Sequence, residues 1–364
     1  MKQAVIIVGT SIKNNKIFLE YLTRQIDKQI NHIDNVYFLD RSSCDLFLEI
    51  EEIISANENI IICAKNGFDL VGKIVSTLTD DVLISQGDML TPSKVLKFTK
   101  DSYLIKSDTK LINVLKVDEL KNIPQILIQK FSNRCSFFLF SDNKGEDLEA
   151  LKKLAISYDG NISHTAITKG LFFVELNHIR YQTQQGFIDM LPKRLHDKIL
   201  FGEDFSKSIT DKLMQYNKKI TCAESCTGGM LSAEIVKHSG VSAIFDGGIV
   251  SYSNEIKHQI LGVEKSTLEN YGAVSKECVK EMLEGLDKIF EADFSLAISG
   301  VAGPSGGSKT KPVGTVVIGV RTKSLSTIEN IHFFGDRNYI QKQAVFYALK
   351  MLALSDKKLF LNKL

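Results

Sequence analysis

The stretch Thr221–Gly229, TCAESCTGG, decides how the C-terminal part of the chain folds. Residues 219–222 predict a strand, and the apolar period that follows predicts a helix over 226–238, whose start falls just after Gly229 or slightly earlier. Such a turn presents side chains at the carboxyl edge of a sheet, where the free N–H groups of the helix point into the same space. A hydroxyl or thiol there can act as a nucleophile. Ser225, Cys226 and Thr227 are therefore the candidates, in an α/β domain.

A structural interpretation of the same segment stays open. Ser and Thr often cap helices at such turns, and a Cys is often a small buried apolar residue. On that interpretation Ser225 or Thr227 is only an N-cap. The segment alone does not decide between the two.

A lysine in the segment YSNEIK, residues 252–257, is the candidate base. A strand over 244–252 precedes it, and a helix begins at Asn254. If Lys257 faces Ser225 in a dry pocket, lowering its pKa from about 10.4 to roughly 7 requires about 4–5 kcal/mol, which burial supplies. Otherwise Lys257 is a solvated surface residue. His258 falls on a different helical face, which makes a Ser–Lys pair more natural than a Ser–His–Asp triad.

Two further segments are candidates for the site. The first follows the predicted strand 294–299, and the second precedes the predicted final helix 338–353. In SGVAGPSGG, residues 299–307, the glycines allow main-chain N–H groups to turn toward an anion. A plain Pro-Gly turn is the alternative there. In FGDR, residues 334–337, Arg337 offers a planar fork suited to phosphate, and a solvated or Asp-paired arginine is its alternative. In open α/β sheets ligands bind where strands end, so these segments support one another.

The N-terminal part alternates between strands and helices. Strands at 3–8, 36–39 and 59–63, with helices at 16–30 and 44–56, predict a parallel sheet. Two hairpin-like strands over 102–116, a helix near 117–132 and a strand at 135–140 follow. A helix at 145–157 and strands at 161–167, 171–176 and 179–183 indicate a small α+β unit. We therefore expect three domains, over residues 1–142, 143–203 and 204–364.

Composition limits the classes of function. Lys plus Arg (45) against Asp plus Glu (43) gives a net charge of +2, which argues against direct nucleic-acid binding. No apolar run reaches membrane-spanning length, and the start MKQAVIIVGTS is too short for a secretion signal, so we expect a cytoplasmic protein without membrane contact. Of the six cysteines, four are scattered, and Cys222 and Cys226 are separated by three residues. This pattern predicts neither a disulfide framework nor a metal site. Residues 201–364 hold 16 of the 24 glycines, which favours that half as the site-bearing part.

Taken together and in order, five motifs resemble the C-terminal domain of the CinA family (competence/damage-inducible protein A). They are TCAESCTGG, FDGGIVSYSNEIKHQILGV, YGAVS at 271–275, ISGVAGPSGG with KPVGTV, and FGDR. The resemblance covers about residues 205–355. It implies a deamidase that hydrolyses the carboxamide of nicotinamide mononucleotide to nicotinate mononucleotide and ammonia, as a homodimer. No metal or organic cofactor is expected, because acyl transfer alone cleaves an amide.

The resemblance also implies roles for single residues. Ser225 would be the nucleophile, Lys257 its base and Tyr252 a further catalytic residue at the pocket, while Arg337 would hold the substrate phosphate. The other expected substrate contacts are Thr227, Gly228, Gly229, Asn254, Ser299, Gly300, Ala302 and Gly303. Main-chain N–H groups near Cys226–Gly229 would stabilise the oxyanion.

The first 200 residues resemble the family's molybdopterin-binding-like α/β domain and its small connecting domain, with departures. The family's GGLGPTxDD loop is replaced by CAKNGFDLVGK at 63–73, and its early GTEL pattern by Gly9–Ile12. Because the flexible glycines and carboxylates are depleted, we predict a scaffold or dimerisation role. Two alternatives stay open: a non-enzymatic, nucleotide-sensing partner in competence or DNA damage, and a metal-dependent ADP-ribose pyrophosphatase in the N-terminal domain.

Overall fold

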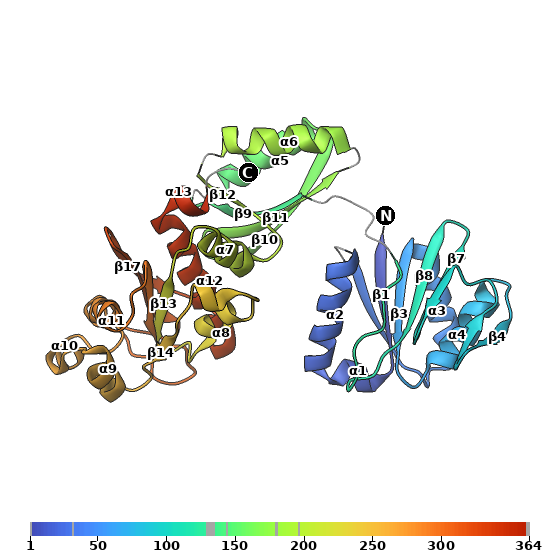
Figure 1. Cartoon of the computed structure of the whole chain (residues 1–364), viewed down its shortest axis with the longest axis horizontal. Helices are drawn as coiled ribbons and strands as arrows, with labels where there is room; N and C mark the ends of the chain where they lie inside the picture. The colour runs from blue at the N-terminus through green and yellow to red at the C-terminus, as the bar shows by residue number, and fades with distance from the viewer. Residues whose placement is uncertain are drawn as a thin grey trace. The chain divides into compact units, whose positions relative to one another are not determined.

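The computed structural model describes residues 2–30, 33–128, 135–142, 145–178, 181–195 and 197–361. The chain divides into two compact units, Met1–Asn133 and Arg134–Leu364 (Figure 1). The fold class is α/β, as the sequence predicts. Within the described ranges, no helix is both long enough and apolar enough to cross a membrane.

A six-stranded sheet forms the centre of the first unit. Its strands, in spatial order, are β2 (Asn35–Leu39), β1 (Gln3–Val8), β3 (Asn59–Ala64), β8 (Lys110–Lys116), β7 (Ser102–Ser107) and β6 (Lys97–Thr99). The first four are parallel, and the last two continue antiparallel. The helices are α1 (Thr10–Asn14), α2 (Lys16–Ile30), α3 (Leu46–Ala56) and α4 (Phe68–Leu78), and a separate hairpin pairs β4 (Leu83–Gln86) with β5 (Met89–Pro92).

Burial on both faces explains why the central strands β1 and β3 are nearly continuous apolar runs. All six residues of β1 are buried. Its alternate side chains Ala4, Ile6 and Val8 pack in the cluster that contains α3 and α4 residues. Val5 and Ile7 point to the opposite face, where α2 packs. The predicted parallel sheet is confirmed.

One predicted element of this unit is wrong. The helix expected over 117–132 is absent over 117–128, and residues 129–132 lie outside the described part. Pro124 removes a helix donor, and the Asn113 side-chain oxygen accepts from the Leu127 N–H at 2.7 Å. The segment is irregular, and its Ile126, Leu127 and Ile128 are buried in the cluster that also contains the α2 side chains. Helix α4 was not predicted.

The second unit begins with a four-stranded antiparallel sheet. Its strands, in spatial order, are β10 (Gly160–Thr168), β11 (Leu171–His178), β9 (Cys135–Phe140) and β12 (Ile199–Phe201). The connecting helices are α5 (Glu146–Ile156) and α6 (Tyr181–Arg194). This βαββαβ order is that of ferredoxin-like folds. The strand expected at 179–183 is wrong where it can be compared, because residues 181–183 are helical; residues 179 and 180 lie outside the described part.

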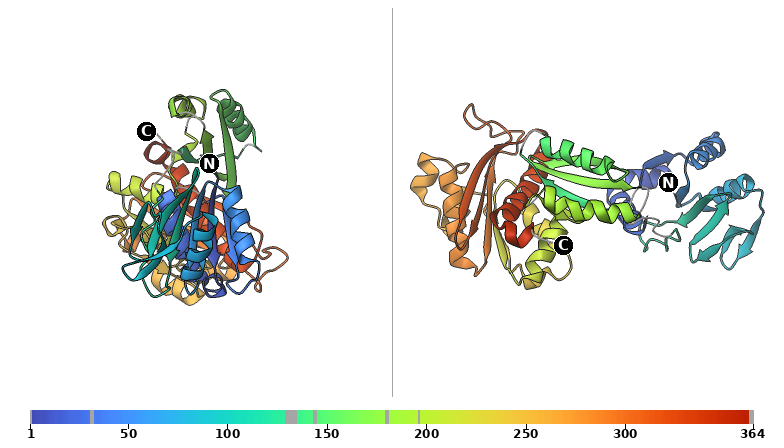
Figure 2. Two further views of the ribbon diagram at one scale, coloured as in Figure 1. Left: turned by 90° about the vertical axis from the view of Figure 1, so that its right-hand side faces the viewer. Right: turned by 90° about the horizontal axis from the view of Figure 1, so that it is seen from above.

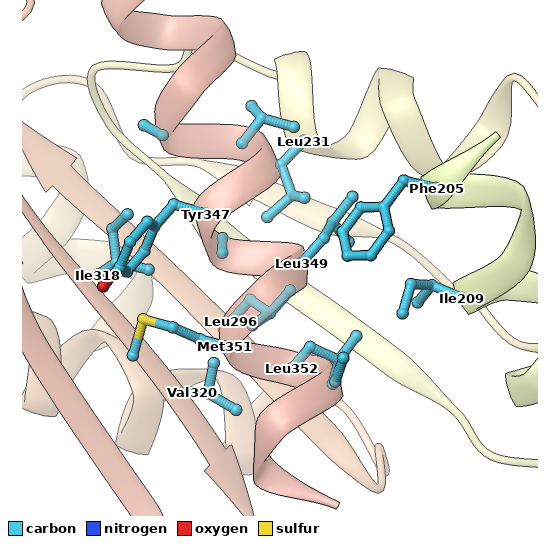
Figure 3. Close-up of a cluster of buried hydrophobic side chains, with 14 of the residues drawn as sticks. Phe205, Ile209, Leu231, Leu296, Ile318, Val320, Tyr347, Leu349, Met351 and Leu352 are labelled. Carbon is cyan, nitrogen blue, oxygen red and sulfur yellow. The ribbon is translucent and has the colours of Figure 1, made fainter. Parts of the chain in front are cut away.

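The two faces of this sheet bury different partners. Phe137 and Leu139 of β9 pack with α5 and α6 residues, whereas Phe138 and Phe140 join the core of the C-terminal sheet. Figure 3 shows part of that shared core, including Phe205. Because β9 pairs with β11 and β12, the division between units falls before this strand rather than at the expected 142/143 boundary. The expected 203/204 boundary lies inside the second unit and stays a prediction.

A five-stranded mixed sheet carries the C-terminal part. In spatial order its strands are β14 (Gly248–Val250), β13 (Ile220–Glu224), β15 (Phe294–Gly300), β16 (Thr315–Thr322) and β17 (Ser326–His332). Strands β14, β13 and β15 are parallel, and the last two are antiparallel.

Helices cover both faces of this sheet (Figure 2). One face packs on α7 (Phe205–Gln215), α8 (Met230–Val236) and α12 (Arg337–Ser355). The other packs on α9 (Asn254–Leu261), α10 (Lys265–Asn270) and α11 (Lys276–Ile289). A short turn η1 (Val241–Ala243) and helix α13 (Lys357–Phe360) complete the unit. The carboxyl ends of β13 and β15 therefore lie between two layers of helices.

Candidate active site

The turn after β13 places Ser225 at the carboxyl edge of the sheet. The Ser225 N–H donates to the Ile298 carbonyl of β15 at 2.9 Å, which ties the turn to the neighbouring strand. Gly228 and Gly229 then adopt φ values of 59° and 99°, a region that favours glycine. These two left-handed residues delay the helix, so α8 begins at Met230, directly after Gly229, which is the later of the two expected starts.

Lys257 reaches Ser225 from a different element. It lies in the first half of α9, whose N-cap Ser253 accepts from the Ile256 N–H. The Lys257 Nζ lies 3.0 Å from the Ser225 Oγ. Ser225 is 8% exposed and Lys257 only 1%. The two groups therefore share a nearly dry environment within proton-transfer distance.

A neutral Lys257 amine can satisfy all of its contacts. Its nitrogen also donates to the carbonyls of Ser251, at 2.7 Å, and Tyr252, at 3.2 Å. A neutral amine has two hydrogens for these two carbonyls and one lone pair for the Ser225 hydroxyl. Burial lowers the pKa of Lys257 below its ordinary value, and the nearby Cys278 and Cys226 thiols oppose that shift only in part.

The competing nucleophile and base are in unfavourable surroundings. Burial raises the pKa of the Cys226 thiol to about 12, which keeps it protonated and weakly reactive near neutral pH. The His258 ring lies with its Nδ1 2.8 Å from the Val263 carbonyl, at the far end of α9. The geometry thus favours a Ser–Lys pair over a thiol or a Ser–His arrangement.

Arg337, the first residue of α12, connects the glycine-rich loop to Tyr252. Its Nη1 donates to the Gly303 carbonyl at 2.8 Å, and its Nη2 to the Tyr252 Oη at 3.3 Å. Tyr252 is 62% exposed, and its own carbonyl accepts from Lys257. Tyr252 therefore links the Ser–Lys pair to the guanidinium.

The other expected contacts occupy varied environments. Thr227 is buried, and its hydroxyl has no hydrogen-bond partner among the described residues. The Ser299 hydroxyl is committed to the Ala273 carbonyl at 2.7 Å, and Ala302 packs in the apolar core. Asn254 is exposed at the start of α9, and Gly300 ends β15. Of this group, Thr227 offers a free buried polar atom.

Two residues that hold the turn were missed by the sequence analysis. Glu224, in the quoted segment itself, is fully buried and bonds to the start of α8. Gln341 donates from α12 to the Cys226 carbonyl at 2.6 Å. A charged residue closing an apolar strand was the available signal for Glu224. Gln341 had none, because its role depends on where α12 packs.

Across the described ranges, no three or more His, Cys, Asp or Glu side chains form a group that could hold a metal ion. What the arrangement offers instead is a buried hydroxyl, an amine with a lowered pKa and a guanidinium.

Residues 202–355 match the family described as the CinA C-terminal domain. The chain belongs to the CinA family. A CinA-like protein of Thermotoga neapolitana is 49% identical over 172 residues, 46% of this chain and 42% of that protein. A putative competence-damage inducible protein of Thermoanaerobacter pseudethanolicus is 46% identical over 151 residues, 41% of this chain and 37% of that protein.

Solved CinA structures match less than half of this chain. The competence damage-inducible protein A from Klebsiella pneumoniae is 35% identical, with a TM-score of 0.40, and the match covers 41% of this chain and 93% of that one. The curated CinA relatives, in contrast, are matched over less than half of their own length.

Proposed function

We propose that the chain is an amidohydrolase that converts nicotinamide mononucleotide to nicotinate mononucleotide and ammonia. The observation that carries the proposal is the 3.0 Å approach of the Lys257 amine to the Ser225 hydroxyl in a buried site. The mononucleotide as substrate rests on the likeness of the site motifs to the CinA family. Homodimerisation and a cytoplasmic location belong to the same proposal.

The reaction begins with proton transfer. Neutral Lys257 takes the proton of the Ser225 hydroxyl as its oxygen attacks the carboxamide carbon. The carbonyl oxygen becomes an oxyanion, which main-chain N–H groups of the turn stabilise. As the C–N bond breaks, Lys257 returns the proton to the departing nitrogen, and ammonia leaves. Water then attacks the acyl-enzyme with Lys257 again as base, which releases the carboxylic acid and restores Ser225.

Substrate recognition is assigned to the groups around this pair. Arg337 has donors beyond the two it gives to Gly303 and Tyr252, and its planar fork suits the ribose phosphate. The unpartnered Thr227 hydroxyl suits a polar group of the substrate, because a buried hydroxyl without a partner costs free energy until one binds.

Replacing the nucleophile tests the proposal. Ser225→Ala should reduce ammonia release from nicotinamide mononucleotide by at least about 1000-fold, because the covalent route is lost. Its fold should stay intact, since the Ser225 contact to Ile298 uses the main chain. Cys226→Ser is the matched control and should keep the activity. An active, well-folded Ser225→Ala variant would remove Ser225 from this role, and an inactive, folded Cys226→Ser variant would favour the thiol.

A further inference from the structure

Glu224 is a buried carboxylate immediately before the proposed nucleophile. It is fully inaccessible to solvent and accepts hydrogen bonds from five groups. Its Oε2 accepts from the N–H groups of Gly229, at 3.1 Å, and Leu231, at 2.9 Å. Its Oε1 accepts from the N–H and the hydroxyl of Ser232, both at 2.8 Å, and lies 3.7 Å from the Cys222 thiol.

These contacts attach the start of α8 to the end of β13. The first N–H groups of a helix have no partners within the helix, and its positive end attracts an anion. Glu224 satisfies three such N–H groups and has its own charge compensated by them. The side chain therefore sets where the helix begins relative to the sheet.

The residue at which α8 begins also determines which main-chain N–H groups of the turn have no acceptor. The Gly228 N–H donates to the Ser225 carbonyl, and the Gly229 N–H to Glu224. In the part of the chain that the structure describes, the N–H groups of Cys226 and Thr227 donate to no main-chain or side-chain oxygen. Among the described residues, two main-chain donors that follow Ser225 directly in the chain are thus without an oxygen partner.

We propose that Glu224 is a positioning residue for the reaction at Ser225: it anchors α8 so that the Cys226 and Thr227 N–H groups stay available to the oxyanion. This inference rests on the proposed function. Glu224 does not touch the substrate. Its effect is on kcat, because the two donors bind the oxyanion more strongly than the neutral carbonyl of the bound substrate.

The test replaces Glu224 by its neutral isostere. In Glu224→Gln one acceptor oxygen becomes an NH₂ group that faces N–H donors, so the clamp loses bonds while the volume is kept. We expect kcat to fall about 100-fold with KM within about twofold, as for removal of an oxyanion donor. Asp204→Asn is the matched control, because Asp204 caps α7 in the same unit through the Lys207 N–H. It should lower thermal stability and keep kcat.

A second readout separates this inference from the deamidase proposal. A fluorophosphonate probe that labels active serines, located by mass spectrometry, should modify Ser225 at least about tenfold more slowly in Glu224→Gln. If the wild type labels but releases no ammonia from nicotinamide mononucleotide, the deamidase proposal fails and the labelling rates still decide the role of Glu224. A wild-type kcat or an unchanged labelling rate in Glu224→Gln would overturn the positioning role. Equal losses of activity in Glu224→Gln and Asp204→Asn, at equal stability of the two variants, would overturn it as well.

Discussion

Lys257 connects burial to chemistry at the scale of a single residue. An exposed lysine is protonated near neutral pH and cannot accept a proton from a serine. The same side chain with 1% exposure has its pKa lowered by the loss of water around it. The two main-chain carbonyls that it binds hold its nitrogen toward Ser225. Position and protonation state thus come from the same local packing.

A pH profile should report this lowered pKa. Below it, Lys257 is protonated, and kcat/KM for ammonia release should fall about tenfold for each pH unit. Because burial lowers the pKa, the midpoint of this acid limb should lie below the ordinary lysine value of 10.5. Steady-state rates between about pH 6 and about pH 10 measure it. A limb centred at the ordinary value or above would contradict a buried base.

The pH dependence of the unfolding free energy provides an independent check on the pKa of Lys257. In the unfolded chain Lys257 keeps its proton up to its ordinary pKa, whereas the folded protein loses it at lower pH. Between the two values the unfolded state binds more protons, so the contribution of this residue to the unfolding free energy rises with pH. Lys257→Met lacks the group. The difference in unfolding free energy between wild type and variant, measured in denaturant, should therefore grow in favour of the wild type as pH rises through that window.

The sequence identifies a candidate site residue where its role is visible in a short motif, and not where that role depends on distant packing. Ser225 and Lys257 each follow a strand in a short polar motif, so both could be predicted as candidates. The carbonyls of Ser251 and Tyr252 carry no side-chain signal, since any residue there would supply the same oxygen. The Thr227 hydroxyl could be expected near the site, but its lack of a partner depends on the surrounding packing.

At the scale of elements, α12 joins the proposed phosphate contact to the nucleophile turn. Arg337 and Gln341 are four residues apart and therefore share one helix face. The first contacts Gly303 and Tyr252, and the second donates to the Cys226 carbonyl at 2.6 Å. One rigid helix thus fixes the distance between the proposed binding group and the proposed reacting group.

Breaking this link should affect turnover more than binding. Gln341→Leu removes the donor to the Cys226 carbonyl and leaves that acceptor unpaired, a loss of about 1–2 kcal/mol. We expect kcat to fall about tenfold, with KM for nicotinamide mononucleotide within about twofold. Gln343→Leu is the matched control on the same helix, because Gln343 binds the Phe334 carbonyl instead. Equal kinetics in the two variants would show that the Gln341 contact does not position the turn.

Elements could be predicted where apolar period and capping agree. Helix α11 (Lys276–Ile289) is such a case: it begins after Ser275, which caps it, and keeps Val279, Met282 and Leu286 buried. The sequence places the start of α8 only between residue 226 and the residue after Gly229, because the apolar period does not reveal that both glycines are left-handed. The helix expected at 117–132 failed because Asn113, far back in sequence, binds the Leu127 N–H. Such long-range side-chain bonds leave no local pattern.

At the scale of the whole molecule, the second unit holds the complete candidate site. Every described contact of Ser225, Lys257 and Arg337 is made within Arg134–Leu364. The ferredoxin-like sheet is part of this unit. Its Phe138, Phe140, Leu171 and Leu200 share a core with α7 and α12. Lys350 of α12, only 3% exposed, donates to the Asp142 carboxylate at 3.1 Å and to the Lys169 carbonyl at 3.0 Å.

This arrangement predicts which truncation keeps the enzyme stable. A fragment of residues 134–364 should keep the wild-type kcat within about twofold, because the site is intact. A fragment of residues 204–364 exposes the apolar surface that Phe138 and Phe140 cover and leaves Lys350 without its two partners. Fully burying one such side chain is worth about 1.5–3 kcal/mol, so its Tm should be at least about 10 °C lower. Calorimetry measures the Tm of the two fragments. The Lys350→Met variant of the longer fragment separates the contribution of the Lys350 amine from that of the apolar contacts. Equal Tm values would mean that the ferredoxin-like sheet adds no stability to the C-terminal sheet, and that the apolar contacts between them form without holding the site in place.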